Sequence, residues 1–218
     1  MSILRYNKLI YSVILFCCFL GGSASAQEMI DDLINAVRLN RGEVAKALLV
    51  RGMDIDTADS SGNTLLMIAS REGHLDLCKY MLDHKANVRI RNGFGESPIM
   101  FAALQGHLEI VKLLQAYGAD INHSGWAPLH YCAWGGHNDI CRFLLEKGAK
   151  IDARSANGTT PIMMAARQGH LGMVKLLLAM SADANLQNEA GATALIWALN
   201  AGSKEVAEIL RQSGARGR

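Results

Sequence analysis

The feature that most constrains the fold is a Gly-His pair that returns at a nearly fixed interval. The pairs are Gly73-His74, Gly106-His107, Gly136-His137 and Gly169-His170, and Gly202-Ser203 takes the same place once more. Successive pairs are separated by 33, 30, 33 and 33 residues. A period of this size is typical of solenoid proteins, in which each unit buries its apolar face against the next.

The residues around each pair indicate two short helices per unit. Thr160-Pro161-Ile162 leads to Ala165-Ala166, then to Gly169-His170 and a second apolar stretch. A hydroxyl residue before proline starts a helix, and glycine ends one because it tolerates a left-handed backbone. The predicted hydroxyl N-caps are Thr64, Ser97, Thr160 and Thr193. Neither helix is long enough to be stable alone, so we expect the array to be the folding unit.

With these motifs and Trp126-Ala127-Pro128-Leu129-His130, residues 59–218 resemble ankyrin repeats. The resemblance implies an all-α solenoid of stacked helix-turn-helix units with short β-turn fingers. We expect about six units: a degenerate N-terminal capping repeat at 27–58, then repeats at 59–91, 92–124, 125–154, 155–187 and 188–218. Lys204 and Arg211 replace the preceding repeat's Leu171 and Leu178, as expected for a polar terminal cap.

Residues 1–26 have the organisation of a secretory signal peptide. Arg5 and Lys8 precede an apolar stretch at 9–20, and Ala24-Ser25-Ala26 supplies small residues for cleavage before Gln27. The apolar stretch is shorter than the roughly 20 residues that cross a bilayer. We therefore expect a periplasmic protein if the source is bacterial, a secreted one otherwise, and no membrane insertion after cleavage.

Charge gives no sign of a nucleic-acid partner. The chain has 22 Lys and Arg against 20 Asp and Glu, and losing Arg5 and Lys8 with the leader makes these numbers equal. A balanced chain is not drawn to nucleic acid or to anionic membranes by its overall charge. We expect a monomer that needs no cofactor.

The histidines predict no metal site. The four in Gly-His pairs recur once per unit, and His130 belongs to the helix-start motif, so we interpret all five as structural. His84 and His123 are predicted to be isolated surface residues. Ligands of one zinc ion must converge within about 2 Å of it, which a ladder of equivalent positions cannot do.

Three cysteines remain after the leader. Cys78 and Cys141 occupy an apolar helix position that Val111 also fills, and Cys132 stands where another repeat has Ala102. We predict buried, inert thiols, because buried cysteine packs as a small apolar side chain. Pairing of Cys132 with Cys141 is an alternative, and a thiol-based redox protein is the rival function.

No pattern indicates an enzyme, and we predict no catalytic residues. No serine lies in a strand-turn-helix elbow, and no Ser, His and acid combination stands apart from the repeat. The glycines mark repeat positions and do not form a phosphate-binding loop.

The resemblance implies partner binding by the finger tips and the inner face of the first helices. Phe94, Leu104, Trp126 and Trp134 are apolar at such positions, with charged residues around them, as in a binding hot spot. The predicted partner-binding residues are Phe94, Glu96, Leu104, Gln105, Trp126, Trp134, Arg71 and Arg167.

Two observations bear on this surface. Trp197 shares its repeat position with Ile68, Phe101, Tyr131 and Met164, a series that we assign to the core between repeats. Repeat 125–154 is three residues short, and the loss falls in its finger. The shortened finger either opens a groove beside Trp126 or lets Trp126 fold into the gap.

The function implied by the resemblance is a non-enzymatic protein–protein interaction module. Resemblance to periplasmic ankyrin-repeat proteins suggests two narrower roles. One is an accessory to oxidative-stress defence beside a catalase, and the other is an immunity protein against an exported toxin.

Overall fold

The computed structural model describes residues 26–217. The predicted leader at 1–26 lies outside the described residues except for Ala26, with which the first described helix begins.

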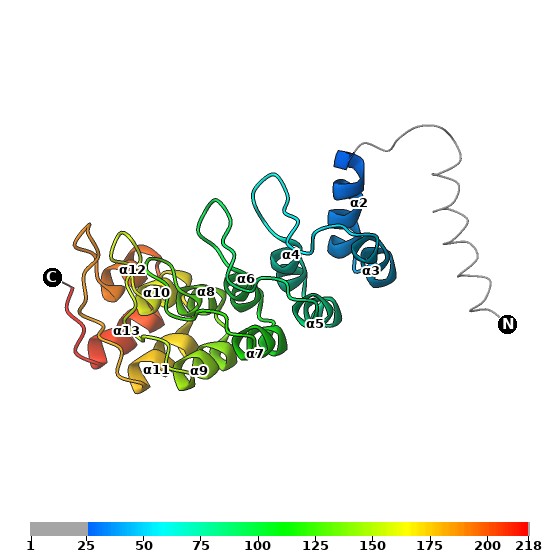
Figure 1. The fold of residues 1–218 in the computed structure, drawn as a ribbon. Helices are drawn as coiled ribbons and strands as arrows, with labels where there is room; N and C mark the ends of the chain where they lie inside the picture. Colours follow the sequence, from blue (N-terminus) through cyan, green and yellow to red (C-terminus); the bar gives the residue numbers. More distant parts are fainter. Residues whose placement is uncertain (1–25, 218) are drawn as a thin grey trace.

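The helices follow one another in pairs that stack in a line (Figure 1). The first helices of the pairs are α2 (Ala26–Arg38), α4 (Leu65–Glu72), α6 (Pro98–Gln105), α8 (Pro128–Gly135), α10 (Pro161–Gln168) and α12 (Ala194–Asn200). The second helices are α3 (Gly42–Val50), α5 (Leu75–Asp83), α7 (Leu108–Ala116), α9 (Asn138–Glu146), α11 (Leu171–Ala179) and α13 (Lys204–Gln212). The predicted helical repeat solenoid is confirmed.

The N-caps are only partly as predicted. Thr64 accepts a hydrogen bond at its hydroxyl from the backbone N–H of Met67, at 3.3 Å, and Thr193 caps α12 in the same way. At Thr160 the buried hydroxyl has no partner among the described residues, although the Thr160 backbone N–H donates to Met163 Sδ at 3.4 Å. Hydroxyl capping is therefore wrong at Thr160, and at Ser97 it is wrong too.

The Gly-His pairs join neighbouring repeats. In each one, the histidine Nε2 lies within hydrogen-bond distance of a backbone carbonyl near the end of the preceding first helix. Because a carbonyl can only accept, Nε2 carries the hydrogen and donates. The bonds run from His74 to Arg38 (3.1 Å), His107 to Arg71 (3.1 Å), His137 to Leu104 (2.9 Å) and His170 to Trp134 (2.9 Å). The structural interpretation of these histidines is confirmed.

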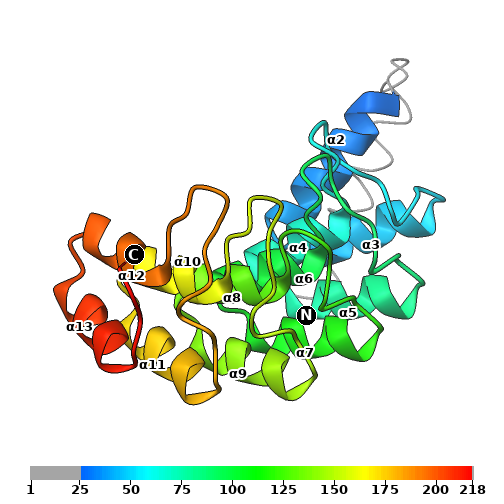
Figure 2. The same cartoon turned by 90° about the vertical axis from the view of Figure 1, so that its left-hand side faces the viewer.

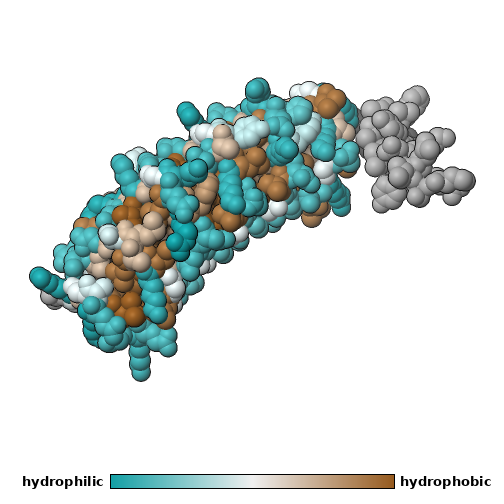
Figure 3. All heavy atoms as spheres, turned by 90° about the horizontal axis from the view of Figure 1, so that it is seen from below, coloured by the Kyte–Doolittle hydropathy of each residue, from teal (hydrophilic) through white to brown (hydrophobic). Residues whose placement is uncertain are grey.

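The core lies between the two helix layers and continues from one end of the array to the other. Seen from the side of the second helices, apolar side chains reach the surface only in patches broken by polar ones (Figure 3). Lys204 and Arg211 are exposed while Leu171 and Leu178 are half-buried, so the last repeat is a polar cap as expected. No helix within residues 26–217 is long and apolar enough to cross a membrane.

Finger loops precede α4, α6, α10 and α12, and in Figure 2 those before α10 and α12 rise above the first helices. In each finger a backbone N–H donates to the carbonyl four residues later. These bonds run from Asp59 to Asn63, Asn92 to Glu96, Ser155 to Thr159 and Asn188 to Ala192. The fingers and the first helices together line one side of the array, which we call the concave face.

The shortened loop before α8 is built differently. His123, predicted to be a surface residue, is buried there, and that prediction is wrong. Its Nδ1 lies 3.0 Å from an Asp120 carboxylate oxygen and contacts the Arg91 guanidinium, and its Nε2 lies 3.4 Å from Ser97 Oγ. Burial and the positive charge of Arg91 lower the pKa of His123. His84 is exposed, as predicted.

Candidate functional site

The candidate site is built on helix α8, where Tyr131 and Trp134 are three residues apart. Side chains at this spacing lie on the same face of a helix. The Trp134 carbonyl accepts the hydrogen bond from His170, and the Leu104 carbonyl accepts that from His137. These two histidine bonds therefore fix the backbone from which the side chains of Trp134 and Leu104 project.

A pocket of about 200 Å³ opens at this point of the concave face. Its lining residues are Leu104, Trp126, His130, Tyr131, Trp134 and Met164, and we call it the Trp126 pocket. Trp126 is 39% exposed. Its ring meets His130 and Tyr131 edge-on, at centroid distances of 5.3 and 6.1 Å. Three predicted residues, Leu104, Trp126 and Trp134, thus come together.

Buried His130 supports the pocket from below. Its Nδ1 accepts the backbone N–H of Ala127 at 3.1 Å, and its Nε2 donates to the Thr159 carbonyl at 3.0 Å. Burial lowers the pKa of His130, which favours the neutral ring. Since both ring nitrogens are bonded, His130 is structural, as predicted, and contributes no free polar group to the pocket.

Arg167 lies beside the pocket between two indole rings. Its guanidinium carbon is 5.4 Å from the ring centroids of both Trp134 and Trp197. Arg167 is exposed and forms no ion pair among the described residues. Trp134 is half-buried under it, and Trp197, assigned from the sequence to the core, also lines a surface hollow with Arg167.

The other two charged residues predicted for this surface are already bonded. Glu96 accepts the Tyr131 hydroxyl at 3.1 Å and the Asn92 side-chain amide at 2.8 Å. Burial and the Glu96 charge raise the pKa of Tyr131 well above its ordinary range. Arg71 pairs with Glu72 at 3.0 Å and lies 6.0 Å from the Phe101 ring centroid.

The two remaining predicted residues also lie outside the pocket. Phe94 is 81% exposed at the tip of its finger, where its backbone N–H donates to Asn92 Oδ1 at 2.9 Å. Gln105 is exposed at the end of α6. The pocket is therefore smaller than the predicted surface.

Tyr131 and Met164 were not predicted as pocket residues because their repeat position also holds Ile68, Phe101 and Trp197, a series typical of the core. The three-residue spacing of Tyr131 and Trp134 could have predicted that Tyr131 lies on the same face of its helix as Trp134. The shortened loop buries His123 and leaves Trp126 open to solvent, so Trp126 does not fold into the gap.

Below the site, a disulfide joins Cys132 of α8 to Cys141 of α9, with an S–S distance of 2.06 Å. The prediction of free thiols is wrong for this pair. The turn between the helices brings the two Cα atoms to 5.7 Å, within the range that a disulfide requires. Cys78 is free and buried, as predicted, and burial raises the pKa of its thiol to about 12.

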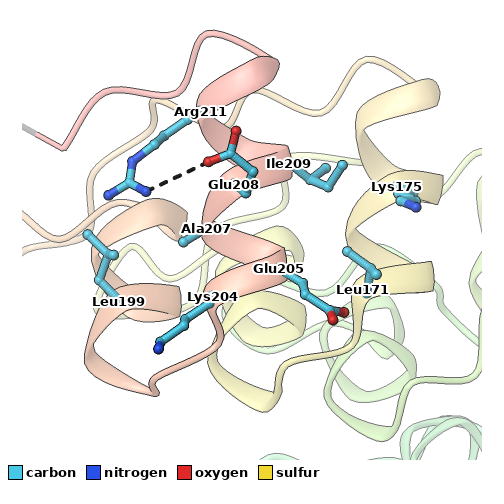
Figure 4. Close-up of a pocket in the computed structure, with 9 residues that line it drawn as sticks. All are labelled: Leu171, Lys175, Leu199, Lys204, Glu205, Ala207, Glu208, Ile209 and Arg211. Atoms are coloured by element: carbon cyan, nitrogen blue, oxygen red, sulfur yellow. Dashed lines mark ion pairs between the residues drawn. The ribbon is translucent and has the colours of Figure 1, made fainter.

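A larger hollow of about 590 Å³ lies at the C-terminal end, among side chains of α11, α12 and α13. In Figure 4 Leu199 and Arg211 project on one side of α13, while Ile209 and Glu205 project on the other, toward α11. Glu208 and Arg211 pair at 4.0 Å. This hollow spreads over both flanks of the polar cap, and it contains none of the predicted residues.

Within residues 26–217, no three His, Cys, Asp or Glu side chains are grouped so as to hold a metal ion.

The family model described as Ankyrin repeats (3 copies) matches residues 30–92, 84–155 and 152–217. This chain belongs to the ankyrin-repeat family. The matched segments together cover most of the residues that the structure describes.

Curated relatives share part of the repeat array. The Candida albicans glycerophosphocholine phosphodiesterase GDE1 is 40% identical over 126 residues, which is 55% of this chain and 11% of that protein. Human protein phosphatase 1 regulatory subunit 27 is 44% identical over 52 residues, 22% of this chain and 34% of its own length. Human ankyrin repeat and KH domain-containing protein 1 is 37% identical over 108 residues, 47% of this chain and 4% of its own length. The matched segments span about a third or less of these relatives.

Proposed function

We propose that this ankyrin-repeat chain is an exported, non-enzymatic binding module that holds a protein partner on its concave face. The observation that carries the proposal is the Trp126 pocket: an open aromatic pocket beside the shortened loop, on the face that ankyrin repeats use for recognition. Exposed aromatic side chains ringed by charged residues are the usual anchors of protein interfaces.

The size of the Trp126 pocket favours a protein partner over a small-molecule ligand. Sites for drug-sized ligands enclose about 300–1,000 Å³, whereas the Trp126 pocket has about 200 Å³. This volume suits one side chain of a larger partner, with the fingers and the neighbouring first helices contacting the rest.

The Cys132–Cys141 disulfide supports export. Disulfides persist in oxidising compartments such as the periplasm and the secretory route, and they are rare in the cytosol. On this proposal the leader directs the chain to the periplasm of a bacterium, or outside the cell in another host. Intact mass of the protein recovered from its producing cells tests this, with a mature N-terminus at Gln27 as the expected result.

The absence of enzymatic activity is part of the same proposal. The match to the phosphodiesterase spans only 11% of that protein. The disulfide pair is fully buried and the Cys78 thiol is buried with a raised pKa, both of which oppose the rival thiol-based redox role.

The two narrower roles, catalase-associated stress defence and immunity against an exported toxin, differ in their partners. A neighbouring catalase gene would favour the first, and a neighbouring exported-toxin gene the second.

Affinity capture tests the proposal with two matched baits. The processed, oxidised protein is compared with Trp126→Ala and with Tyr117→Ala, since Tyr117 is similarly exposed at 43% but lies at the end of second helix α7. We expect one protein from an extract of the source cells to be retained by the parent and by Tyr117→Ala and lost from Trp126→Ala. Truncation of an anchor residue costs about 2 kcal/mol or more of binding free energy. Equal retention by all three baits would place the interface elsewhere.

A further inference from the structure

We propose that the partner seats an apolar side chain in the Trp126 pocket and pairs a neighbouring carboxylate with Arg167. This inference rests on the proposed function and names the chemistry of the segment that the concave face recognises: an apolar anchor with an acidic residue close to it.

The lining of the pocket favours an apolar anchor. Apart from the two indole N–H groups, its polar side-chain groups are already bonded: His130 at both ring nitrogens, and the Tyr131 hydroxyl to Glu96. Apart from those two donors, a polar occupant would find no free side-chain group in the lining to replace its hydrogen bonds to water. A cationic occupant would also meet the positive charge of Arg167, stacked on Trp134.

Arg167 is prepared for a carboxylate. The rings of Trp134 and Trp197 hold its guanidinium on the surface, which reduces the rotamer freedom that pairing would cost. A guanidinium presents donors that match the two oxygens of a carboxylate. Arg71, on the same face, differs from Arg167 because Glu72 already neutralises its charge. Arg167 has no such acid among the described residues.

The apolar and cationic sites are contiguous. Trp134 contributes to the wall of the Trp126 pocket and also stacks under Arg167. One short segment of a partner can therefore reach both the pocket and Arg167. The Glu96 carboxylate does not compete with that segment for Arg167, because Tyr131 and Asn92 donate hydrogen bonds to its two oxygens.

Selection from a randomised twelve-residue peptide library tests the inference on the oxidised full chain. Four proteins are used: the parent, Trp126→Ala, Arg167→Gln and Arg142→Gln. Arg142 is an exposed arginine on second helix α9 and serves as the matched charge control. Circular dichroism checks that all four have the same helix content.

We expect the parent and Arg142→Gln to enrich peptides with Asp or Glu near an aromatic or branched aliphatic residue. For the best such peptide, Trp126→Ala should weaken binding about thirtyfold. Arg167→Gln should weaken it about three- to fivefold, with a loss of the acidic preference and of the salt dependence.

The outcomes separate the inference from the function beneath it. Peptides that depend on Trp126 but show no acidic preference, or that bind Arg167→Gln equally well, would overturn the pairing and leave the concave-face function standing. Peptides indifferent to both Trp126 and Arg167 would overturn both. Enrichment of basic peptides by the parent would overturn the assignment of charge.

Discussion

Two helix-ending glycines show how a single methyl group can act through backbone strain or through contact. Gly106 and Gly148 have positive φ angles of 83° and 88°. A Cβ atom at Gly106 would lie 2.6 Å from His137 Cε1, whereas at Gly148 nothing lies within 4 Å. The left-handed backbone favours glycine at both positions, and the histidine ladder adds a second requirement at Gly106 alone.

We therefore expect Gly106→Ala to destabilise the chain more than Gly148→Ala does. Backbone strain alone should cost about 1 kcal/mol at Gly148, and strain plus displacement of His137 about 2–3 kcal/mol at Gly106. Urea unfolding followed by circular dichroism measures both. Equal losses would mean that His137 moves aside freely and that its bond to the Leu104 carbonyl contributes little.

The buried thiol of Cys78 makes stability depend on pH at the alkaline end. Burial raises its pKa from 9.0 to about 12, so the folded chain keeps the thiol neutral where the unfolded chain ionises it. Its contribution is fully present below pH 9 and is lost as the pH rises from 9 toward 12.

Cys78→Val removes this titration and places at the site the residue found at the equivalent positions 111 and 174. Between pH 7 and pH 10 we expect the parent to lose about 1 kcal/mol more unfolding free energy than the variant. Urea titrations at the two pH values give the difference. An identical pH dependence in the two proteins would show that Cys78 does not titrate on unfolding.

At the scale of helices, the disulfide joins the two members of one pair, α8 and α9, beneath the Trp126 pocket. The repeats at 92–124 and 155–187 hold the same pair together with Ala and Val at the two cysteine positions. Cys132→Ala with Cys141→Val reproduces that packing, so the double variant isolates the covalent link.

For a closed loop of this length, loss of the link should cost about 2–3 kcal/mol of unfolding free energy. Urea titration of the parent and the double variant without reductant measures this cost. The intact mass of the oxidised parent should be two hydrogens lower than that of the reduced parent. Equal stability of the two proteins would contradict a constraining role for the disulfide in α8 and α9.

The sequence predicted the helix pairs because each carries its own start and stop signals, repeated with the period of the array. It did not predict the Cys132–Cys141 bond, since pairing depends on how closely the turn brings two Cα atoms. Hydroxyl capping was predicted wrongly at Ser97 and Thr160, whose side chains accept no cap hydrogen bond from the backbone of the helix that follows.

The candidate site was predictable only in outline. Trp126 stood out because the other repeats carry Asn63, Glu96, Thr159 and Ala192 at its position. Leu104 and Trp134 line the same pocket. Phe94 does not join them, because its place depends on the path of a finger. The stacking of Arg167 between two indoles arises from contacts across three repeats, which the residue types at one repeat position cannot reveal.

At the scale of the whole molecule, the stacked repeats distribute stability along the array, and we expect the N-terminal unit to be the least stable part. In α3 only Ala45 is fully buried, and Val50 is exposed. In a solenoid each unit is stabilised only by its neighbours, so an end unit can unfold while the rest stays folded.

The three tryptophans lie between residues 126 and 197, and they report only on the C-terminal half, whereas far-ultraviolet circular dichroism reports on every helix. Leu33→Ala truncates a fully buried side chain of α2 and removes about 2–5 kcal/mol of local packing. We expect its dichroism transition in urea to begin earlier while its tryptophan fluorescence transition stays close to that of the parent.

Leu177→Ala, equally buried in α11, is the matched control and should shift the fluorescence transition. If Leu33→Ala instead shifts both signals by the same amount, the whole array unfolds as one block. The concave-face site would then share the stability of the N-terminal unit, and substitutions there would weaken partner binding from a distance. Separate transitions would mean that the Trp126 pocket survives loss of that unit, because α6, α8 and α10 hold its walls.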